Sequence, residues 1–273
     1  MTDLQGRLTL ITGAATGIGR LLSFEVAQRG AVPVLWDLDE ERLGAVVEEL
    51  QRRCGTKARG YACDVSDREA VHDTAERVRA EAGDPDVVVN NAGVVSGARL
   101  LDLTDEQIRH TFEVNALALY WVTRAFLPAM VARNGGHIVT IASAAGLVGV
   151  AGQSDYAASK HAAVGFDESM RAELRRTAPG VITTVVCPYY IDTGMFEGAR
   201  TRVPFLLPIL RQGDVARKVA GAIEHDRRLL VMPPAIRLLP LLRILPPRQF
   251  DLLMDLLGVN VSMEHFVGHD GSA

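Results

Sequence analysis

Short apolar runs alternate with longer segments of helical periodicity along most of the chain. Seven runs are expected to form strands, near residues 7–12, 31–36, 58–63, 86–90, 137–142, 181–187 and 229–232. Most are apolar at consecutive positions, as in Val87-Val88-Val89, which is typical of parallel strands covered by helices on both faces. The alternation predicts an α/β fold with a single doubly wound, seven-stranded parallel sheet and right-handed connections.

Pro33 lies inside the second expected strand. Because proline cannot donate a hydrogen bond to a strand ladder, it argues against a central position for this strand. Near the start of a strand it can be tolerated, so the prediction of a strand here stands.

The composition agrees with a single domain over residues 1–273. The chain is 48% hydrophobic and 23% charged, and its net charge of −4 gives no electrostatic attraction for nucleic acid. The three cysteines are expected to be free thiols in a reducing compartment, and neither they nor the seven histidines have metal-ligand spacing. No signal peptide or apolar run of ~18 residues is present, and the first strand begins soon after Met1. We therefore expect no metal site and a cytoplasmic location.

A glycine-rich turn follows the first expected strand. The segment Gly13-Ala14-Ala15-Thr16-Gly17-Ile18-Gly19 has Gly-x-x-x-Gly-x-Gly spacing and leads into a helical pattern. Glycine lets the backbone turn sharply and approach a pyrophosphate, which then lies at the positive end of the helix. A tight turn without a ligand is the alternative, but the position in a strand-turn-helix unit favours a dinucleotide site.

Asp37 ends the second expected strand, roughly where a dinucleotide fold places a carboxylate that accepts hydrogen bonds from the adenosine ribose hydroxyls. A 2'-phosphate at that position would meet a negative charge. Neither Leu38 nor Thr16 supplies a basic side chain to offset it. We therefore expect NAD rather than NADP as the cofactor.

Tyr156 and Lys160 stand four residues apart, which places them on one face of a helix, and Ser143 precedes them in the chain. A phenol has a pKa near ~10, but a nearby cation favours its ionised form. Two unit charges ~4 Å apart interact by ~4 kcal/mol at an effective dielectric constant of ~20. We expect Lys160 to lower the pKa of Tyr156 towards neutrality, so that the phenol can exchange a proton while a hydride moves.

Together these motifs resemble the short-chain dehydrogenase/reductase superfamily over residues 8–193. The resemblance implies a Rossmann-type domain with a catalytic tetrad at Asn115, Ser143, Tyr156 and Lys160. Tyr156 would be the general acid/base, and Ser143 would hydrogen-bond the substrate oxygen. Lys160 would also hold the nicotinamide ribose, and Asn115 would position a water that connects Lys160 to solvent.

The same resemblance implies the cofactor contacts. On the adenosine and pyrophosphate side they are Gly13, Thr16, Gly17, Ile18, Gly19, Asp37, Asp64, Val65, Asn91, Ala92 and Gly93, and on the nicotinamide side Tyr156, Lys160, Pro188, Ile191 and Thr193. The chain departs from the family in one place, because Tyr189 follows Pro188 where the family usually has glycine. We expect this to change the shape of the pocket beside the nicotinamide.

Residues 187–196, which include the nicotinamide loop, are also similar to the branch that contains membrane-associated retinol dehydrogenases and lipid-droplet 17-beta-hydroxysteroid dehydrogenases. So are Met232-Pro233 and the stretch rich in leucine and proline that follows them. That similarity implies a large apolar alcohol or ketone as substrate. Residues 189–211 are expected to form a substrate lid, and with Val94-Val95 and residues 146–148 they supply an apolar wall that favours a lipid-like alcohol over a sugar. The alternative is that some of these side chains only pack the lid on the domain.

Residues 233–273 form an apolar C-terminal extension. Leucine and isoleucine are crowded between prolines, with Arg237, Arg243 and Arg248 among them. An interfacial membrane helix has this composition, but so has a segment that is buried against a partner subunit or the lid. Burial is the favoured hypothesis, because so large an apolar area should not stay exposed to water, and transient peripheral contact with a membrane is the second.

Two alternatives to an NAD-dependent alcohol dehydrogenase stay open. A non-catalytic dinucleotide-binding regulator or scaffold would be expected to lose a residue of the tetrad, and all four are present. An NADPH-linked carbonyl reductase is disfavoured by Asp37. The family resemblance also implies a homodimer or homotetramer through the long helices near residues 104–132 and 154–177.

Overall fold

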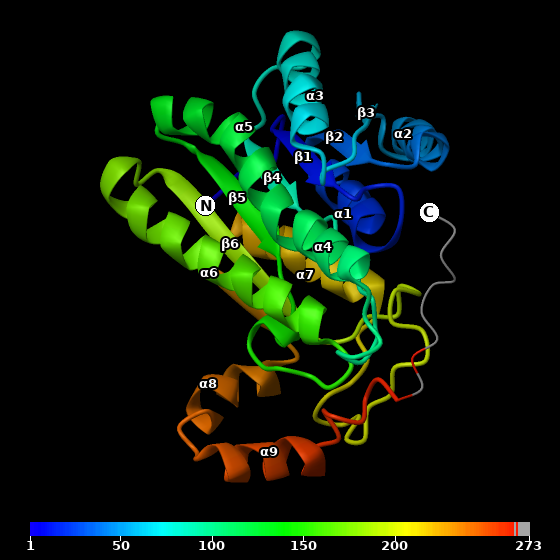
Figure 1. Cartoon of the computed structure of the whole chain (residues 1–273). Coiled ribbons are helices and arrows are strands. Elements are labelled where there is room, and N and C mark those ends of the chain that lie inside the picture. The colour runs from blue at the N-terminus through cyan, green and yellow to red at the C-terminus, as the bar shows by residue number, and fades with distance from the viewer. Residues whose placement is uncertain (265, 267–273) are drawn as a thin grey trace.

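The computed structural model of the chain describes residues 1–264 and 266. Its strands are β1 (Leu8–Thr12), β2 (Val32–Asp37), β3 (Arg59–Ala62), β4 (Val87–Asn90), β5 (Gly136–Ile141), β6 (Val181–Pro188) and β7 (Leu229–Met232). All seven are parallel and form one sheet in the order β3-β2-β1-β4-β5-β6-β7 (Figure 1). The predicted doubly wound sheet is confirmed, and the strand order reverses between β1 and β4.

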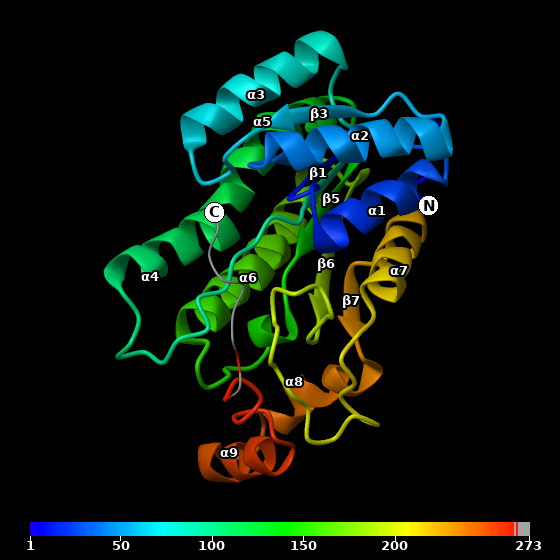
Figure 2. The same cartoon turned by 90° about the vertical axis from the view of Figure 1, so that its right-hand side faces the viewer.

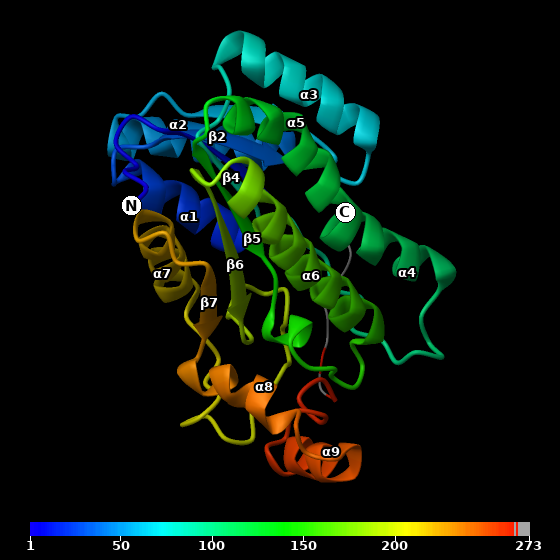
Figure 3. The same cartoon turned by 90° about the vertical axis from the view of Figure 1, so that its left-hand side faces the viewer.

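Helices cover both faces of the sheet. They are α1 (Gly17–Ala27), α2 (Glu40–Cys54), α3 (Arg68–Glu81), α4 (Asp105–Phe112), α5 (Ala118–Ala132), α6 (Ser154–Thr177), α7 (Gln212–Glu224), α8 (Leu239–Leu242) and α9 (Pro247–Leu256). A π-helical turn, η1 (Glu113–Leu117), joins α4 to α5, and two short 3₁₀ helices are η2 (Ala144–Gly146) and η3 (Pro234–Leu238). Side chains of α1, α2 and α7 pack on one face of the sheet, and those of α3, α5 and α6 on the other (Figures 2 and 3).

Consecutive residues of a strand enter different cores. Ile11 and Val89 pack with α1 and α7, whereas their neighbours Leu10 and Val88 pack with α3, α5 and α6. Successive side chains of a strand point to opposite faces, so a strand covered on both faces must be apolar at consecutive positions. This is the reason that the strands could be recognised as unbroken apolar runs.

β2 pairs with both β1 and β3, so the argument from Pro33 against a central position was wrong. The N–H of Val32 donates to the carbonyl of Arg7, which turns the nitrogen of residue 33 towards the β3 side. Pairing with β3 begins only at Val34, opposite Arg59. The N–H that proline lacks therefore falls just outside this ladder, and no strand hydrogen bond is lost.

The helical run from α4 through η1 to α5, Asp105–Ala132, is long and apolar enough to cross a membrane by length and composition. Half of its apolar window is buried, however, and Phe126 and Met130 lie in the core beneath the sheet. The apolar side of this run is therefore accounted for by its packing as a core helix.

The C-terminal extension follows β7 as η3, α8 and α9 and lies beyond the carboxyl ends of β6 and β7 (Figure 3). Its buried residues Ile236, Leu239 and Met254 share one apolar cluster with Leu207 of the lid segment. In this structure the extension thus packs on the lid. The last part of the predicted extension, residues 265 and 267–273, lies outside the described residues.

Asp167 is a buried carboxylate on α6, the helix that carries two of the predicted catalytic residues. Its Oδ2 accepts hydrogen bonds from Arg171 Nη1 at 3.0 Å and from Thr183 Oγ1 at 3.4 Å. Its Oδ1 has no hydrogen-bond partner among the described residues. Burial raises the pKa of Asp167 to about 6, although Arg171 acts in the opposite direction.

We expect Asp167→Asn to stabilise the protein above the folded-state pKa. Because that pKa is raised, the stability associated with the carboxyl group is fully present below its ordinary pKa of ~3.9 and is lost as the pH rises through about 6. Two pKa units correspond to at most about 3 kcal/mol, and loss of the Arg171 pair reduces the gain. Urea unfolding at about pH 5 and about pH 8 measures the difference.

Glu173→Gln, at an exposed position on the same helix, is the control and should leave the pH dependence unchanged. The account of Asp167 is contradicted if Asp167→Asn is no more stable than the native chain at the higher pH.

Candidate active site

The turn between β1 and α1 depends on glycine. Gly13 and Gly17 have φ angles of +65° and +52°, in the left-handed region, and a Cβ on Gly19 would overlap the carbonyl oxygen of Gly13. A Cβ on Gly13 would lie 2.9 Å from the Cα of Ala92. Thr16, the residue before α1, makes no side-chain cap, so the first N–H groups of this helix remain available to an anion.

Asp37 lies at the carboxyl end of β2 and is tied to the glycine turn. Its Oδ2 accepts from the Ala15 N–H at 2.8 Å, and its Oδ1 accepts from the Asp39 N–H at 3.1 Å. A carboxylate has about four acceptor positions, so about two remain for hydroxyl donors. The half-buried carboxylate is therefore held beside the turn with acceptor capacity to spare.

Asn91 braces the glycine turn from the end of β4. Its Nδ2 donates to the carbonyl oxygens of Thr12 at 2.8 Å and Gly13 at 3.1 Å. In return, the N–H groups of Asn91 and Ala92 donate to Thr12 Oγ1, each at 3.0 Å. The side chain of Asn91, predicted as a cofactor contact, thus supports the turn through its own amide.

The remaining residues predicted for the adenosine side occupy supporting positions. After β3, Asp64 Oδ1 accepts from the N–H and the hydroxyl of Ser66, and Val65 is buried in the core beneath α3. Ile18 packs on the core from the first turn of α1.

The four predicted catalytic residues come together at the carboxyl end of β5. Ser143 lies just beyond Ala142, the residue that follows this strand, and with Tyr156 it lines one cavity. The Lys160 ammonium donates to the carbonyl oxygen of Ile141 at 3.0 Å and lies 5.7 Å from the centroid of the Tyr156 ring. Lys160 is thus held behind the phenol by the strand that carries Ser143.

Asn115 lies in the π-helical turn between α4 and α5, a distortion that is frequent at functional sites. Its Oδ1 accepts from the Val94 N–H, and its Nδ2 donates to the Val94 carbonyl and to Ser159 Oγ on α6. A Cβ on Gly93 would lie 3.2 Å from Asn115 Oδ1 and 3.4 Å from Lys160 Nζ. The Asn115 amide and the Lys160 ammonium therefore both lie close to Gly93, where there is little room for a larger side chain.

Burial decides the protonation of the phenol. It raises the pKa of Tyr156 to about 12, although the Ser143 hydroxyl acts in the opposite direction, and it lowers the pKa of Lys160 to about 8. The expectation that Lys160 alone brings the pKa of Tyr156 towards neutrality was therefore wrong. Removal from water disfavours both charged forms, and at this separation the pair does not compensate for the lost solvation.

The segment after β6 reaches back to the glycine turn. Pro188 ends β6, and Ile191 forms a β-bridge with Leu210. The side chain of Thr193 lies beside Gly17, 3.7 Å from where a Cβ on that glycine would be. The predicted nicotinamide loop and the predicted pyrophosphate turn are thus neighbours in space.

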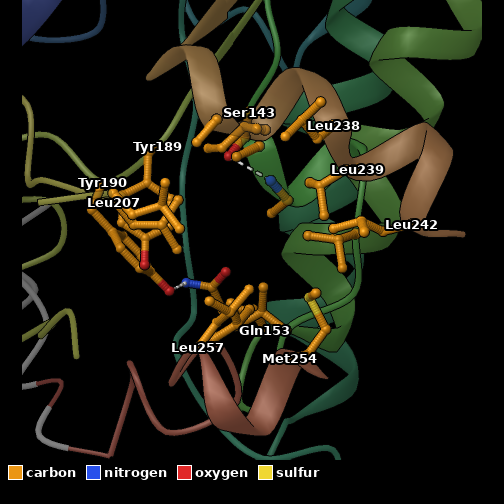
Figure 4. A pocket seen from close by; sticks show the side chains of 18 of the residues that line it. Ser143, Gln153, Tyr189, Tyr190, Leu207, Leu238, Leu239, Leu242, Met254 and Leu257 are labelled. Carbon is orange, nitrogen blue, oxygen red and sulfur yellow. Dashed lines mark hydrogen bonds between the residues drawn. The ribbon is translucent and has the colours of Figure 1, made fainter. Parts of the chain in front are cut away.

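An apolar cavity opens beside Ser143 and Tyr156 (Figure 4). Its space is about 850 Å³, open mouth included. The domain, the lid and the extension all contribute to its lining: Ser143, Ala144, Ala145, Val148, Val150, Gln153, Tyr156, Tyr189, Tyr190, Phe196, Leu206, Leu207, Ala235, Ile236, Leu238, Leu239, Leu242, Met254, Leu257 and Val259. Apart from one serine, one glutamine and the tyrosine hydroxyls, this lining is apolar.

Residues 189–211, the predicted lid, contribute part of this wall. Phe196 lies edge-on to Tyr156 and to Tyr190, with ring centroids 5.7 Å and 5.1 Å away. Phe205, also assigned to the wall, is 87% exposed instead, and Val94 packs in the core beneath α5. The apolar character of the lid therefore serves both the cavity and an outer surface.

Gln153 was not predicted as a site residue. It directly precedes α6, is 1% exposed and lines the cavity three residues before Tyr156. Glutamine at a helix start is usually solvated, so its distance of about one helical turn from Tyr156 was the signal that could have indicated this position. As for metals, no group of three or more His, Cys, Asp or Glu within residues 1–264 and 266 could hold an ion.

The family model described as short chain dehydrogenase matches residues 7–203. Epidermal retinol dehydrogenase 2 of Mus musculus is 45% identical over 97% of this chain and 87% of its own length, and Retinol dehydrogenase 10 of Homo sapiens is 42% identical over 97% and 86%.

Among solved structures, a short chain dehydrogenase/reductase from Burkholderia phymatum in complex with NAD has a TM-score of 0.81 and 30% identity, covering 93% of this chain and 97% of its own. The alcohol dehydrogenase from Thermococcus sibiricus complexed with 5-hydroxy-NADP has a TM-score of 0.74 and 26% identity, covering 84% and 95%.

Gly19→Ala should abolish dinucleotide binding while leaving most of the fold intact. The added methyl group would overlap the Gly13 carbonyl, which is backbone and cannot rotate away, so the turn has to open. Gly44→Ala on α2 is the control, because nothing lies within 4 Å of its added Cβ. Titration with NAD, followed by the quenching of protein fluorescence, should give at least about 100-fold weaker binding for Gly19→Ala, equivalent to about 2.7 kcal/mol. Unchanged affinity would contradict the assignment of the turn.

Proposed function

The chain belongs to the short-chain dehydrogenase family, and from this premise we propose that it transfers a hydride between NAD and a large apolar alcohol or ketone. The observation that carries the proposal is the cavity beside Ser143 and Tyr156, whose lining is almost wholly apolar. Relatives named retinol dehydrogenases at 42–45% identity support the same substrate class. An oxidoreductase with a nicotinamide dinucleotide is the general function, and the substrate and the choice of NAD are its proposed refinements.

The residues at the carboxyl edge of the sheet fit a dinucleotide. The glycine turn and the open N-terminus of α1 would hold the pyrophosphate, because only glycine fits there and the helix end attracts anions. Asp37 would accept hydrogen bonds from the adenosine ribose, with Asp64, Val65, Asn91, Ala92 and Gly93 shaping the adenosine side. Lys160, Pro188, Ile191 and Thr193 would surround the nicotinamide half.

Asp37 favours NAD over NADP. Its carboxylate is held in place by two backbone N–H groups, so it cannot easily move away from a 2'-phosphate. Positions 16 and 38 hold threonine and leucine, so neither supplies a positive charge that would neutralise such a phosphate. A reductase linked to NADPH is the second candidate, since one solved relative carries an NADP derivative.

When bound, the nicotinamide ring accepts or supplies the hydride and, in its oxidised form, carries a positive charge. Tyr156 would take the proton of the alcohol during oxidation and return it during reduction, while Ser143 would hydrogen-bond the same oxygen. Burial raises the pKa of Tyr156 to about 12 and lowers that of Lys160 to about 8 in the protein alone, so a further positive charge beside the phenol, such as that of the oxidised nicotinamide ring, would be needed to stabilise its ionised form near neutrality. Asn115 would connect Lys160 to solvent through a water, as the family resemblance implies.

Tyr156→Phe should keep NAD affinity within a few-fold and lower turnover by about 10²–10⁴-fold, because it removes only the acid/base hydroxyl. The assay follows the absorbance of the reduced cofactor with retinoids, hydroxysteroids, long-chain alcohols and small polyols, each with NAD and with NADP. The native chain should prefer apolar alcohols and NAD. A preference for small polyols would contradict the proposed substrate class. Faster turnover with NADP would contradict the proposed cofactor, and full activity of Tyr156→Phe would contradict the proposed mechanism.

A homodimer or homotetramer through α5 and α6 is part of the proposal. Leu117, Tyr120 and Val131 are apolar residues on η1 and α5 that remain 38–46% exposed in the single chain. Apolar side chains exposed along one helical run are typical of an interface.

The lid and the extension would also contact an anionic lipid surface. Residues 200–212 and 233–250 contain six arginines and neither Asp nor Glu, although the whole chain has a net charge of −4. Phe205, Leu241 and Ile244 in the same segments are 64–87% exposed. Basic residues among exposed apolar side chains favour binding at the interface of an anionic membrane. This surface adjoins the cavity, because Leu206 and Leu238 are partly exposed and also line the cavity.

Arg243→Glu with Arg248→Glu should reduce flotation with liposomes that contain phosphatidylserine, because each reversal turns attraction to the leaflet into repulsion. The matched control is Arg175→Glu with Arg176→Glu in the last turn of α6, at the far end of the sheet, which changes the charge equally. The native chain should float with anionic liposomes and much less with neutral ones. Absence of co-flotation for the native chain, or equal loss in both double variants, would remove the lipid contact from the proposal.

A further inference from the structure

A chain of hydrogen bonds runs through one wall of the apolar cavity. Gln153 Nε2 donates to the Tyr190 hydroxyl at 3.4 Å, the Tyr190 and Ser262 hydroxyls are 2.8 Å apart, and Ser262 Oγ donates to the Val259 carbonyl at 2.6 Å. Gln153, Tyr190 and Ser262 are all at most 7% exposed. These hydrogen bonds thus join the start of α6 to the lid and to the C-terminal extension.

The number of available hydrogens determines which group donates in each of these hydrogen bonds. A hydroxyl has one hydrogen, and that of Ser262 is used on the Val259 carbonyl. Tyr190 must therefore donate to Ser262, which leaves the Tyr190 oxygen able only to accept. Gln153 must then present its NH₂ group to Tyr190, and the network locks the amide against rotation.

The amide oxygen of Gln153 is consequently left over as an acceptor. None of the hydrogen bonds among the described residues involves this Oε1, and Figure 4 shows it turned towards the open middle of the cavity. The neighbouring wall residues Leu242, Met254 and Leu257 offer no donor. This oxygen is therefore open to a hydrogen bond from a molecule in the cavity, and a bound substrate that displaced water from it without donating would lose that hydrogen bond.

We propose that Gln153 Oε1 is a binding subsite for a hydroxyl or N–H group at the end of the substrate remote from the reacting carbon. The inference rests on the proposed function, which places the reacting carbon at Ser143 and Tyr156. Figure 4 shows Ser143 and Gln153 on opposite sides of an open space, with Leu207 on one flank and Leu239 and Leu242 on the other. The preferred substrate is then an apolar molecule with two polar ends, one oxidised at Ser143 and one donating to Gln153.

The subsite distinguishes donors from acceptors. A second hydroxyl can donate to Oε1, whereas a ketone at the same position would set two carbonyl oxygens against each other, and a hydrocarbon end would leave Oε1 unpaired. One hydrogen bond that is lost in a buried site corresponds to roughly 10–100-fold in affinity. A simple apolar alcohol should therefore be a poorer substrate than the corresponding diol.

The test uses long-chain alcohols of several lengths in three forms: the mono-alcohol, the terminal diol, and the alcohol with a ketone at the far end. For each, kcat/KM with NAD and the equilibrium affinity for the protein with NAD bound are measured. At the matching length, the diol should exceed the mono-alcohol and the keto-alcohol by roughly 10-fold or more in both quantities. The affinity measurement tests the subsite even if turnover fails, so that failure of the proposed function and failure of the subsite are distinguishable.

Two variants separate recognition from a structural role. Gln153→Met keeps the length of the side chain without its acceptor, so the ratio of kcat/KM for the diol to kcat/KM for the mono-alcohol should fall to about one. Tyr190→Phe removes the partner that locks the amide, so Gln153 can turn its NH₂ group to the cavity, and the keto-alcohol should improve relative to the diol.

Equal affinities for the three forms in the native chain would overturn the proposal, as would a failure of all of them to bind. A Gln153→Met variant that loses affinity for the diol and the mono-alcohol by the same factor would also overturn it, because the glutamine would then only support the wall.

Discussion

Tyr156 and Lys160 are both removed from water, and the chemistry of the site depends on that shared burial. A phenol in this position has a pKa of about 12 and an ammonium a pKa of about 8, so burial shifts both groups towards their neutral forms, and near pH 7 the phenol is neutral while the ammonium keeps its charge. The ammonium is held by a single carbonyl of β5, Ile141, and neighbours the amide of Asn115 in the π-helical turn. The protein therefore supplies the position of the proton carrier, and a charge that arrives with a ligand has a large effect there, because little solvent screens it.

The two ends of the site are built on different physical grounds. At the dinucleotide end, backbone packs so closely on backbone that only glycine fits, and the Asn91 amide fastens the turn of β1 to the end of β4. At the substrate end, side chains from the domain, the lid and the extension meet around a space. The first end is rigid and general to a dinucleotide fold, whereas the second can change its shape and polarity by single substitutions.

The Gln153–Tyr190–Ser262 hydrogen bonds give this second end a polar element that its apolar lining would otherwise lack. They connect three segments that are far apart in the sequence, and the direction of every hydrogen in them follows from the Val259 carbonyl at one end. The aromatic rings of Tyr190, Phe196 and Tyr156 pack edge to face along the same wall. The proposed subsite at Gln153 and the predicted catalytic Tyr156 are thus connected, because Tyr190 and Phe196 of the lid contact the segment that carries both.

Sequence patterns were sufficient to predict the sheet, the glycine turn, and which residue types meet at the carboxyl ends of the strands. Apolar runs, glycine spacing and a four-residue helical step are local patterns, and local patterns follow directly from backbone geometry. The tertiary structure alone decided that Pro33 could lie in an interior strand, that burial raises the pKa of Tyr156, and that Gln153 faces the cavity. Each of these depends on where neighbours from distant segments begin, end or exclude water, and no pattern within one segment carries that information.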